Sequence, residues 1–128
     1  MRILVVDDYP GAAQASCMLL EAMGHEVQSA LDGTTALTLA VTFAPEVVIL
    51  DIGLPDASGY DIARQLRSLP RRPFIVAMTG WGTVRDRVQS LAAGIDEHVV
   101  KPASMEKLTA IIEAAKRKLN GDDESDRA

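Results

Sequence analysis

The sequence is poor in cysteine, in basic residues and in long apolar runs, and each shortage excludes a class of protein. Cys17 is the only cysteine among 128 residues, which excludes an intrachain disulfide and a thiolate metal cluster. The net charge of −5 argues against a general nucleic-acid or anionic-membrane surface, because both need a basic face. No apolar run approaches membrane-spanning length. We therefore expect a cytoplasmic protein without direct nucleic-acid or membrane binding, whose acidic balance permits a cation site.

The length and the 48% hydrophobic content predict one globular domain with a single core. This domain is expected over residues 1–120. Half of the final residues, 121–128, are acidic, and this segment is expected to form a disordered tail.

The stretch over residues 45–51 organises the chain, because four consecutive large aliphatic residues end abruptly at Asp51. A strand that is apolar on both faces is typical of a parallel sheet covered by helices. Ligands of such sheets bind beyond the carboxyl ends of the strands, where Asp51 is expected. Alternatively, Asp51 only caps the turn that follows.

Strand and helix patterns alternate along the rest of the chain. Further strands are expected over 2–6, 25–30, 73–78 and 95–100, and helices over 10–23, 34–43, 60–69, 83–93 and 105–119, the last with Ser104 as N-cap. This alternation predicts an α/β fold with a doubly wound parallel sheet of five strands. Two strand orders are common, and the lack of a glycine fingerprint after the first strand favours the flavodoxin-like (βα)5 order 2-1-3-4-5.

Polar residues follow four strands that this order brings together. They are Asp7 and Asp8, Asp51, Thr79, and Lys101. Three neighbouring carboxylates repel one another, so the group should recruit a cation or one member should take a proton. An oxygen-only site suits Mg²⁺. A hydroxyl and an ammonium suit a transferring phosphoryl group, and a carboxylate such as Asp51 can accept it.

Each polar residue also has a structural explanation. Asp7 and Asp8 could cap the first helix, Thr79 could begin an ordinary turn, and Lys101 could be a surface lysine. The convergence of all of them at one edge favours the functional interpretation.

The chain resembles the receiver domain of two-component response regulators, the CheY-like family, and its stretches Gly80-Trp81-Gly82 and Gly94-Ile95-Asp96-Glu97-His98 are similar to the receivers of hybrid histidine kinases. The resemblance covers residues 1–120 and rests on Val5-Val6-Asp7-Asp8, Leu50-Asp51-Ile52-Gly53-Leu54-Pro55 with Gly59, Met78-Thr79-Gly80 and Val100-Lys101-Pro102. It implies that Asp51 takes a phosphoryl group from a phosphohistidine on a histidine kinase or a histidine phosphotransfer protein.

The same resemblance implies a Mg²⁺ site and a switch. Asp8, Asp51 and the carbonyl of Gly53 would bind the metal directly, and Asp7 would bind it through water. Thr79 and Lys101 would contact the phosphoryl oxygens, and the Lys101–Pro102 peptide bond would be cis. Thr79 would be coupled to a switch residue that is usually aromatic, and His98 occupies that position here.

The implied function is a phospho-accepting signalling switch, which is a receiver and not an enzyme and catalyses only its own phosphorylation and dephosphorylation. Its output would be a changed surface on the helix over 83–93, the strand over 95–100 and the last helix, read by an unidentified downstream protein. The charges of these helices, among them Lys107 and Lys116, are expected to be a solvated face. Gly53 and Trp81 would flank the phosphoryl group and influence its lifetime.

We expect a monomer or a weak dimer, and either a single-domain regulator or a piece of a longer protein. A receiver-like module that binds proteins without phosphorylation is the main alternative. An aspartyl-phosphate phosphatase of the haloacid-dehalogenase type would need a second Asp where Gly53 stands. A nucleotide-binding module is disfavoured because Gly80-Trp81-Gly82 is only a fragment of its glycine fingerprint.

Overall fold

The computed structural model describes residues 1–80, 88 and 92–120. Most of the helix predicted over 83–93 lies outside the described residues. Trp81, just before that helix, lies outside them too. The predicted tail over 121–128 lies outside them as well.

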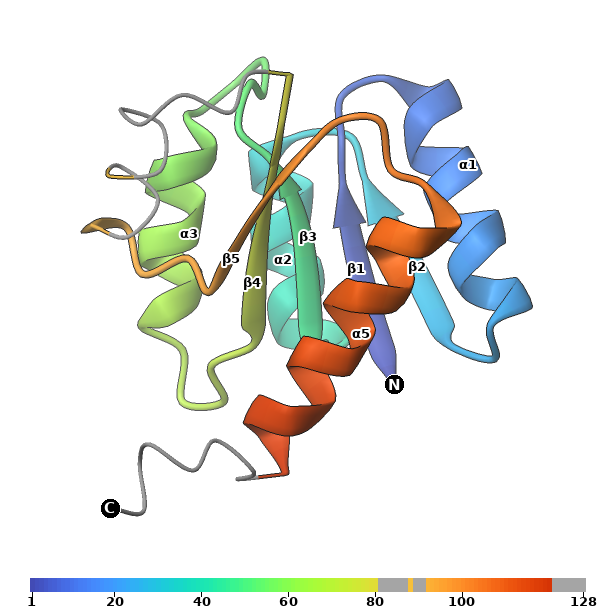
Figure 1. Ribbon diagram of the computed structural model, residues 1–128. Coiled ribbons are helices and arrows are strands. Elements are labelled where there is room, and N and C mark those ends of the chain that lie inside the picture. Colours follow the sequence, from blue (N-terminus) through green and yellow to red (C-terminus); the bar gives the residue numbers. More distant parts are fainter. Residues whose placement is uncertain (81–87, 89–91, 121–128) are drawn as a thin grey trace.

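Five parallel strands form one sheet in the order β2-β1-β3-β4-β5, which confirms the predicted order (Figure 1). The strands are β1 (Arg2–Val6), β2 (Glu26–Ala30), β3 (Val47–Asp51), β4 (Phe74–Thr79) and β5 (Glu97–Val100). Every residue of β3 and β4 is buried, as expected for central strands covered on both faces. The largely exposed β2 lies at one edge, also as predicted.

The strand β5 begins at Glu97, two residues later than predicted. Asp96 forms the approach to the strand instead, because its N–H donates to the Ile75 carbonyl and its carboxylate accepts the Ile75 N–H, each at 2.8 Å. The other sheet edge is therefore a strand of only four residues.

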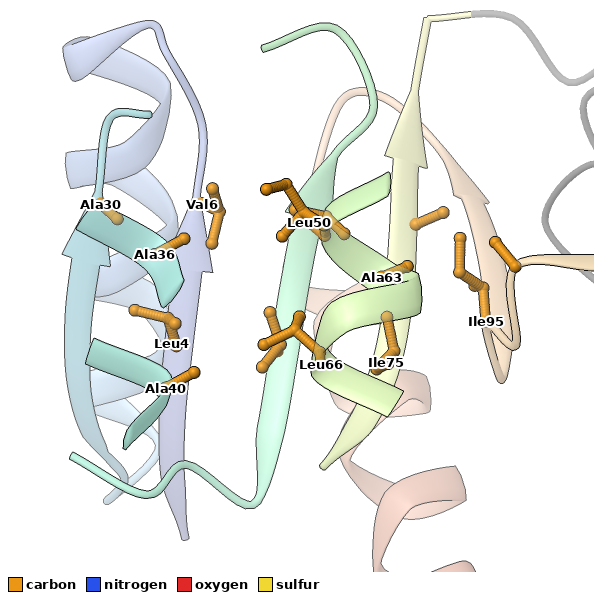
Figure 2. Packing of buried hydrophobic residues seen from close by; sticks show 14 residues of the cluster. Leu4, Val6, Ala30, Ala36, Ala40, Leu50, Ala63, Leu66, Ile75 and Ile95 are labelled. Carbon is orange, nitrogen blue, oxygen red and sulfur yellow. The ribbon is translucent and has the colours of Figure 1, made fainter. Parts of the chain in front are cut away.

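Helices α1 (Pro10–Ala22) and α5 (Met105–Leu119) cover one face of the sheet, and α2 (Gly33–Thr42) and α3 (Gly59–Arg67) cover the other (Figure 1). Alternate residues of each central strand enter opposite cores, because side chains of a strand alternate between faces. Leu4, Leu50 and Ile75 pack under α2 and α3 (Figure 2), whereas their neighbours along the strands pack under α1 and α5.

The helix boundaries follow local hydrogen-bonding groups. Gly24, with φ of 95°, follows α1 in the left-handed conformation that glycine tolerates. The helix α2 begins one residue earlier than predicted, because the Asp32 carboxylate caps it by accepting the Thr35 N–H at 2.7 Å. Ser58 and Ser104 cap α3 and α5 in the same way, the latter as predicted.

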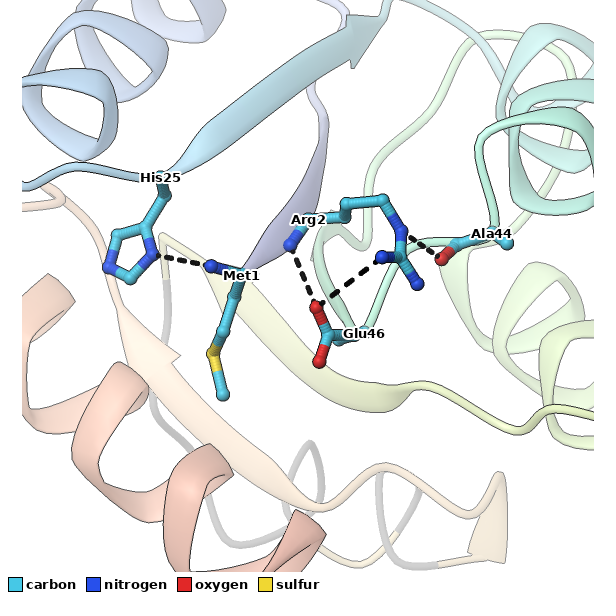
Figure 3. Close-up of polar contacts among 5 residues, drawn as sticks. All are labelled: Met1, Arg2, His25, Ala44 and Glu46. Carbon is cyan, nitrogen blue, oxygen red and sulfur yellow. Dashed lines mark hydrogen bonds and ion pairs between the residues drawn. The ribbon is translucent and has the colours of Figure 1, made fainter.

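A polar cluster fixes the amino ends of β1 and β3, far from the carboxyl edge (Figure 3). The Arg2 N–H donates to Glu46 Oε1 at 3.0 Å, and its guanidinium donates to the Ala44 carbonyl at 2.9 Å. Met1 and His25 make a further contact between the start of β1 and the approach to β2. None of the described helices is both long and apolar enough to span a membrane.

Candidate functional site

The sheet places the predicted site residues at one edge. Asp7 directly follows β1, Asp51 and Thr79 end β3 and β4, and Lys101 directly follows β5. These strands are neighbours and parallel, so their carboxyl ends lie side by side.

Three carboxylates meet at this edge. One oxygen each from Asp7, Asp8 and Asp51 lies within 4.8 Å of the others. Asp51 is buried, with 7% of its surface exposed, whereas Asp8 is exposed. Carboxylate oxygens on a partly open site fit Mg²⁺, which prefers oxygen ligands and keeps several waters.

Lys101 bridges two of these carboxylates. Its Nζ lies 3.2 Å from Asp51 Oδ2 and 3.6 Å from Asp7 Oδ2. Burial alone would lower the pKa of Lys101, but the interactions with Asp51 and Asp7 outweigh it and raise the pKa. The ammonium is therefore held in its charged form, and the group keeps two net negative charges when every member is ionised.

Backbone N–H groups orient the two carboxylates toward Lys101. The Gly53 N–H donates to Asp51 Oδ1 at 3.1 Å, and the Tyr9 N–H donates to Asp7 Oδ1 at 3.0 Å. Asp7 thus orders the turn before α1 with one oxygen and leaves the other for the site. Asp7 can therefore cap the turn and contribute to the site at the same time.

Thr79 and His98, the two predicted switch residues, occupy different places. Thr79 is buried, and its carbonyl accepts the Lys101 N–H at 2.7 Å, which joins the ends of β4 and β5. His98 lies two residues before the end of β5, opposite Ala77. Both ring nitrogens of His98 are buried and have no hydrogen-bond partner within the described residues.

The loop between β3 and α3 is tied to its surroundings on two sides. A Cβ added to Gly59 would lie 2.6 Å from Ile52 Cα and 2.7 Å from the Asp51 carbonyl oxygen, so the loop closes against the backbone of Asp51 and Ile52. At its outer side, Asp56 accepts hydrogen bonds from the N–H groups of Gly33 and Thr34 at 2.8 and 3.1 Å.

Sequence reasoning missed Asp56, because its partners lie 23 and 22 residues away and no local pattern marks them. The hydrogen bond from Gly33 is the largest of the influences that lower the pKa of Asp56. The bond joins the start of α2 to the loop that carries Gly53.

The expectation that Lys107 belongs to a solvated face is wrong. Its Nζ donates to the Val100 carbonyl at 2.7 Å and to the Pro102 carbonyl at 3.2 Å. These carbonyls flank Lys101, whose peptide bond to Pro102 is cis. A lysine three residues after the N-cap Ser104, where an acidic residue or glutamine is favoured, was the signal that could have revealed it.

Comparisons with known proteins agree on one family. The family model of the response regulator receiver domain matches residues 3–113. The transcriptional regulatory protein KdpE of Mycobacterium tuberculosis is 40% identical over 116 residues, which cover 91% of this chain and 51% of KdpE. A receiver domain protein (CheY-like) from Methanospirillum hungatei has a TM-score of 0.82 and 28% identity, with 97% of each chain covered.

A second relative bears on the expectation of no direct nucleic-acid binding. The DNA-binding dual master transcriptional regulator RpaA of Synechocystis is 33% identical over 119 residues, which cover 91% of this chain and 49% of RpaA. The chain thus spans about half the length of these curated relatives. Their names give no support to an absence of nucleic-acid binding, so that expectation is withdrawn.

Proposed function

The chain belongs to the response regulator receiver domain family, and on that premise we propose that it is a phospho-accepting switch of a two-component system. The observation that carries the proposal is the buried Asp51 carboxylate, 3.2 Å from the Lys101 ammonium and beside two further carboxylates. This arrangement combines a nucleophile, a cation for phosphoryl oxygens and a place for a divalent metal.

The proposed reaction transfers a phosphoryl group from a phosphohistidine to Asp51. A carboxylate oxygen of Asp51 forms a bond to phosphorus as the bond from the imidazole nitrogen to phosphorus breaks, and the imidazole then takes a proton. The donor would be a histidine kinase or a histidine phosphotransfer protein. No separate substrate is converted, so the protein is a signalling receiver rather than an enzyme acting on other molecules.

Mg²⁺ is the proposed cofactor. Asp8, Asp51 and the Gly53 carbonyl would hold it directly, and Asp7 would hold it through water. The chemistry that it supplies when bound is neutralisation of the charge on the phosphoryl oxygens.

Lys101 and Thr79 are proposed to contact the phosphoryl oxygens. Phosphorylation replaces the carboxylate partner of Lys101 with a more highly charged group at the same place, so the ammonium keeps an anionic partner. The Thr79 carbonyl accepts a hydrogen bond from the Lys101 N–H. A shift of the end of β4 would therefore displace the end of β5, and the reverse.

The proposed output couples Thr79 to His98 and then to the surface of the segment over 83–93, β5 and α5. The buried ring nitrogens of His98 distinguish this switch position from an aromatic hydrocarbon ring, because they favour an arrangement that offers them a hydrogen-bond partner. The downstream partner, the cytoplasmic location and the monomeric or weakly dimeric state stay predictions, as does the influence of Gly53 and Trp81 on phosphoryl lifetime.

The competing candidate is a receiver-like module that binds proteins without phosphorylation. The three neighbouring carboxylates and the bridging lysine disfavour it, because crowding like charges at one edge of the sheet costs free energy unless they bind something.

The proposal is tested by intact-protein mass spectrometry after incubation with Mg²⁺ and acetyl phosphate. We expect the mass of one phosphoryl group to be added to the wild type. The addition should be absent from Asp51→Asn and abolished by a chelator. A folded wild-type protein that gains no mass from acetyl phosphate or from a phosphohistidine donor would support the phosphorylation-independent module instead.

A further inference from the structure

Lys107 stands where the local rules of helix formation disfavour it. It is the third residue of α5, and its own N–H is capped by Ser104 Oγ at 3.2 Å. In a capping box this position carries glutamate or glutamine, whose side chain returns to the N-cap. The partial positive charge of a helix N-terminus also disfavours a cation in the first turn. A residue that breaks local preferences in this way calls for a compensating contact.

The compensating contact lies on the segment that carries Lys101. The Lys107 ammonium donates to the carbonyls of Val100 and Pro102, the residues immediately before and after Lys101. The Lys101 N–H is itself bonded to the Thr79 carbonyl. Hydrogen bonds therefore hold the backbone on both sides of Lys101 and at its own N–H.

Val99 and Ala103 pack against the core beneath α1 and α5, but the backbone between them lies at the edge of the sheet. This segment follows β5, a four-residue strand at the edge of the sheet whose residues are exposed or half-buried. The Lys101 side chain is long and 36% exposed, so its ammonium can keep its place beside Asp51 only if its backbone is fixed. A hydrogen-bonded charge from the neighbouring helix supplies that anchor.

We infer that Lys107 is a positioning residue for phosphoryl acceptance, which clamps the Val100 and Pro102 carbonyls and thereby aims Lys101 at the group on Asp51. This inference rests on the proposed function, in which Lys101 contacts the phosphoryl oxygens. Lys107 acts through Lys101 and needs no contact of its own with the phosphoryl group.

Lys107→Gln separates this role from a merely structural one. Glutamine suits the capping position and removes the cation from the helix N-terminus, so α5 should be as stable as before or more so. The shorter, neutral side chain cannot bond both carbonyls as the ammonium does. The inference therefore expects an unchanged or higher melting temperature together with slower phosphorylation.

The measurement is the initial rate at which acetyl phosphate phosphorylates Asp51 at saturating Mg²⁺, with the Mg²⁺ dissociation constant determined separately. A catalytic group displaced by an ångström can cost orders of magnitude, and we expect a loss of about tenfold for Lys107→Gln. The Mg²⁺ dissociation constant should stay unchanged, because the metal ligands are untouched. Lys107→Arg, which keeps the donors, should restore most of the rate.

Lys118→Gln is the matched control, because the same change is made at an exposed position in the last turn of the same helix. It should leave the rate unchanged. If folded Lys107→Gln is phosphorylated as fast as the wild type, or Lys118→Gln loses as much, the positioning role is wrong while the proposed function stands. If the wild type accepts no phosphoryl group, both fall together.

Discussion

At the residue scale, the Lys101 ammonium neutralises part of the carboxylate charge when no metal is bound. It would therefore compete with a metal ion for the same carboxylates. Its ammonium lies within 3.6 Å of both Asp7 and Asp51. A charge at about 4 Å is worth roughly 1 kcal/mol even when fully screened by water. The bridging ammonium should therefore oppose the binding of a dication.

Lys101→Met tests this competition. Removing the ammonium should tighten Mg²⁺ binding by about fivefold, the equivalent of roughly 1 kcal/mol. Isothermal titration of Mg²⁺ into both proteins measures the change. Weaker binding in Lys101→Met would show instead that the lysine supports the metal site by ordering its carboxylates.

Two glycines of the β3–α3 loop differ in how much space surrounds them. A Cβ on Gly59 would meet backbone atoms of Ile52 and Asp51, whereas a Cβ on Gly53 would meet nothing within 4 Å. Gly59→Ala should lower the free energy of unfolding by about 1–3 kcal/mol, because backbone must move to admit the methyl group. Thermal and urea unfolding measure the loss. Gly53→Ala is the matched control, and an equal loss there would contradict this account.

At the scale of elements, α2 and the β3–α3 loop are joined by a carboxylate that favours its ionised form. The Asp56 pKa is lowered, first by the hydrogen bond from the Gly33 N–H. A group whose pKa is lower in the folded state stabilises the fold above its unfolded-state pKa, and this stabilisation is lost as the pH falls through the folded-state pKa.

Asp56→Asn should therefore lower the free energy of unfolding at neutral pH. The difference in stability between variant and wild type should shrink as the pH falls. Urea unfolding of wild type and variant across the acidic range measures the difference in stability at each pH. Glu113→Gln, at an exposed position on α5, is the control and should show no comparable convergence. A difference that stays constant down to low pH would mean that Asp56 acts without its charge.

Features of the elements that depend on neighbouring residues could be predicted from the sequence, whereas contacts between distant residues could not. The apolar runs that end at Val6, Leu50 and Met78 were predictable, because both their length and their termination are local. The link between Asp56 and Gly33 and the late start of β5 were not, because each depends on groups more than twenty residues away. Lys107 was predictable in part, since its conflict with the capping position is visible in the sequence while its partners are not.

At the scale of the whole molecule, the sheet order turns separated polar residues into one site. Once the order 2-1-3-4-5 was inferred, the convergence of Asp7, Asp51, Thr79 and Lys101 followed from the parallel strands alone. The distances within the site did not, because they depend on side-chain orientations set by the N–H groups of Tyr9 and Gly53.

Metal binding should stabilise the whole fold, because the proposed ligands come from two separate strand ends that only the folded chain brings together. Mg²⁺ at 100 times its dissociation constant should add about 2.7 kcal/mol to the free energy of unfolding, or roughly 10 °C in melting temperature. Calorimetry with Mg²⁺ and with a chelator measures the shift. Asp8→Asn should abolish most of it, and an equal shift in that variant would place the metal elsewhere.

The most direct test of the central claim is to locate the phosphoryl group by chemistry. Borohydride reduces an aspartyl phosphate to homoserine, so peptide mass spectrometry after phosphorylation and reduction identifies the modified residue. The account predicts homoserine at position 51 and at no other carboxylate. Homoserine at position 7 or 8, or a phosphoryl group that survives reduction on another type of side chain, would contradict it.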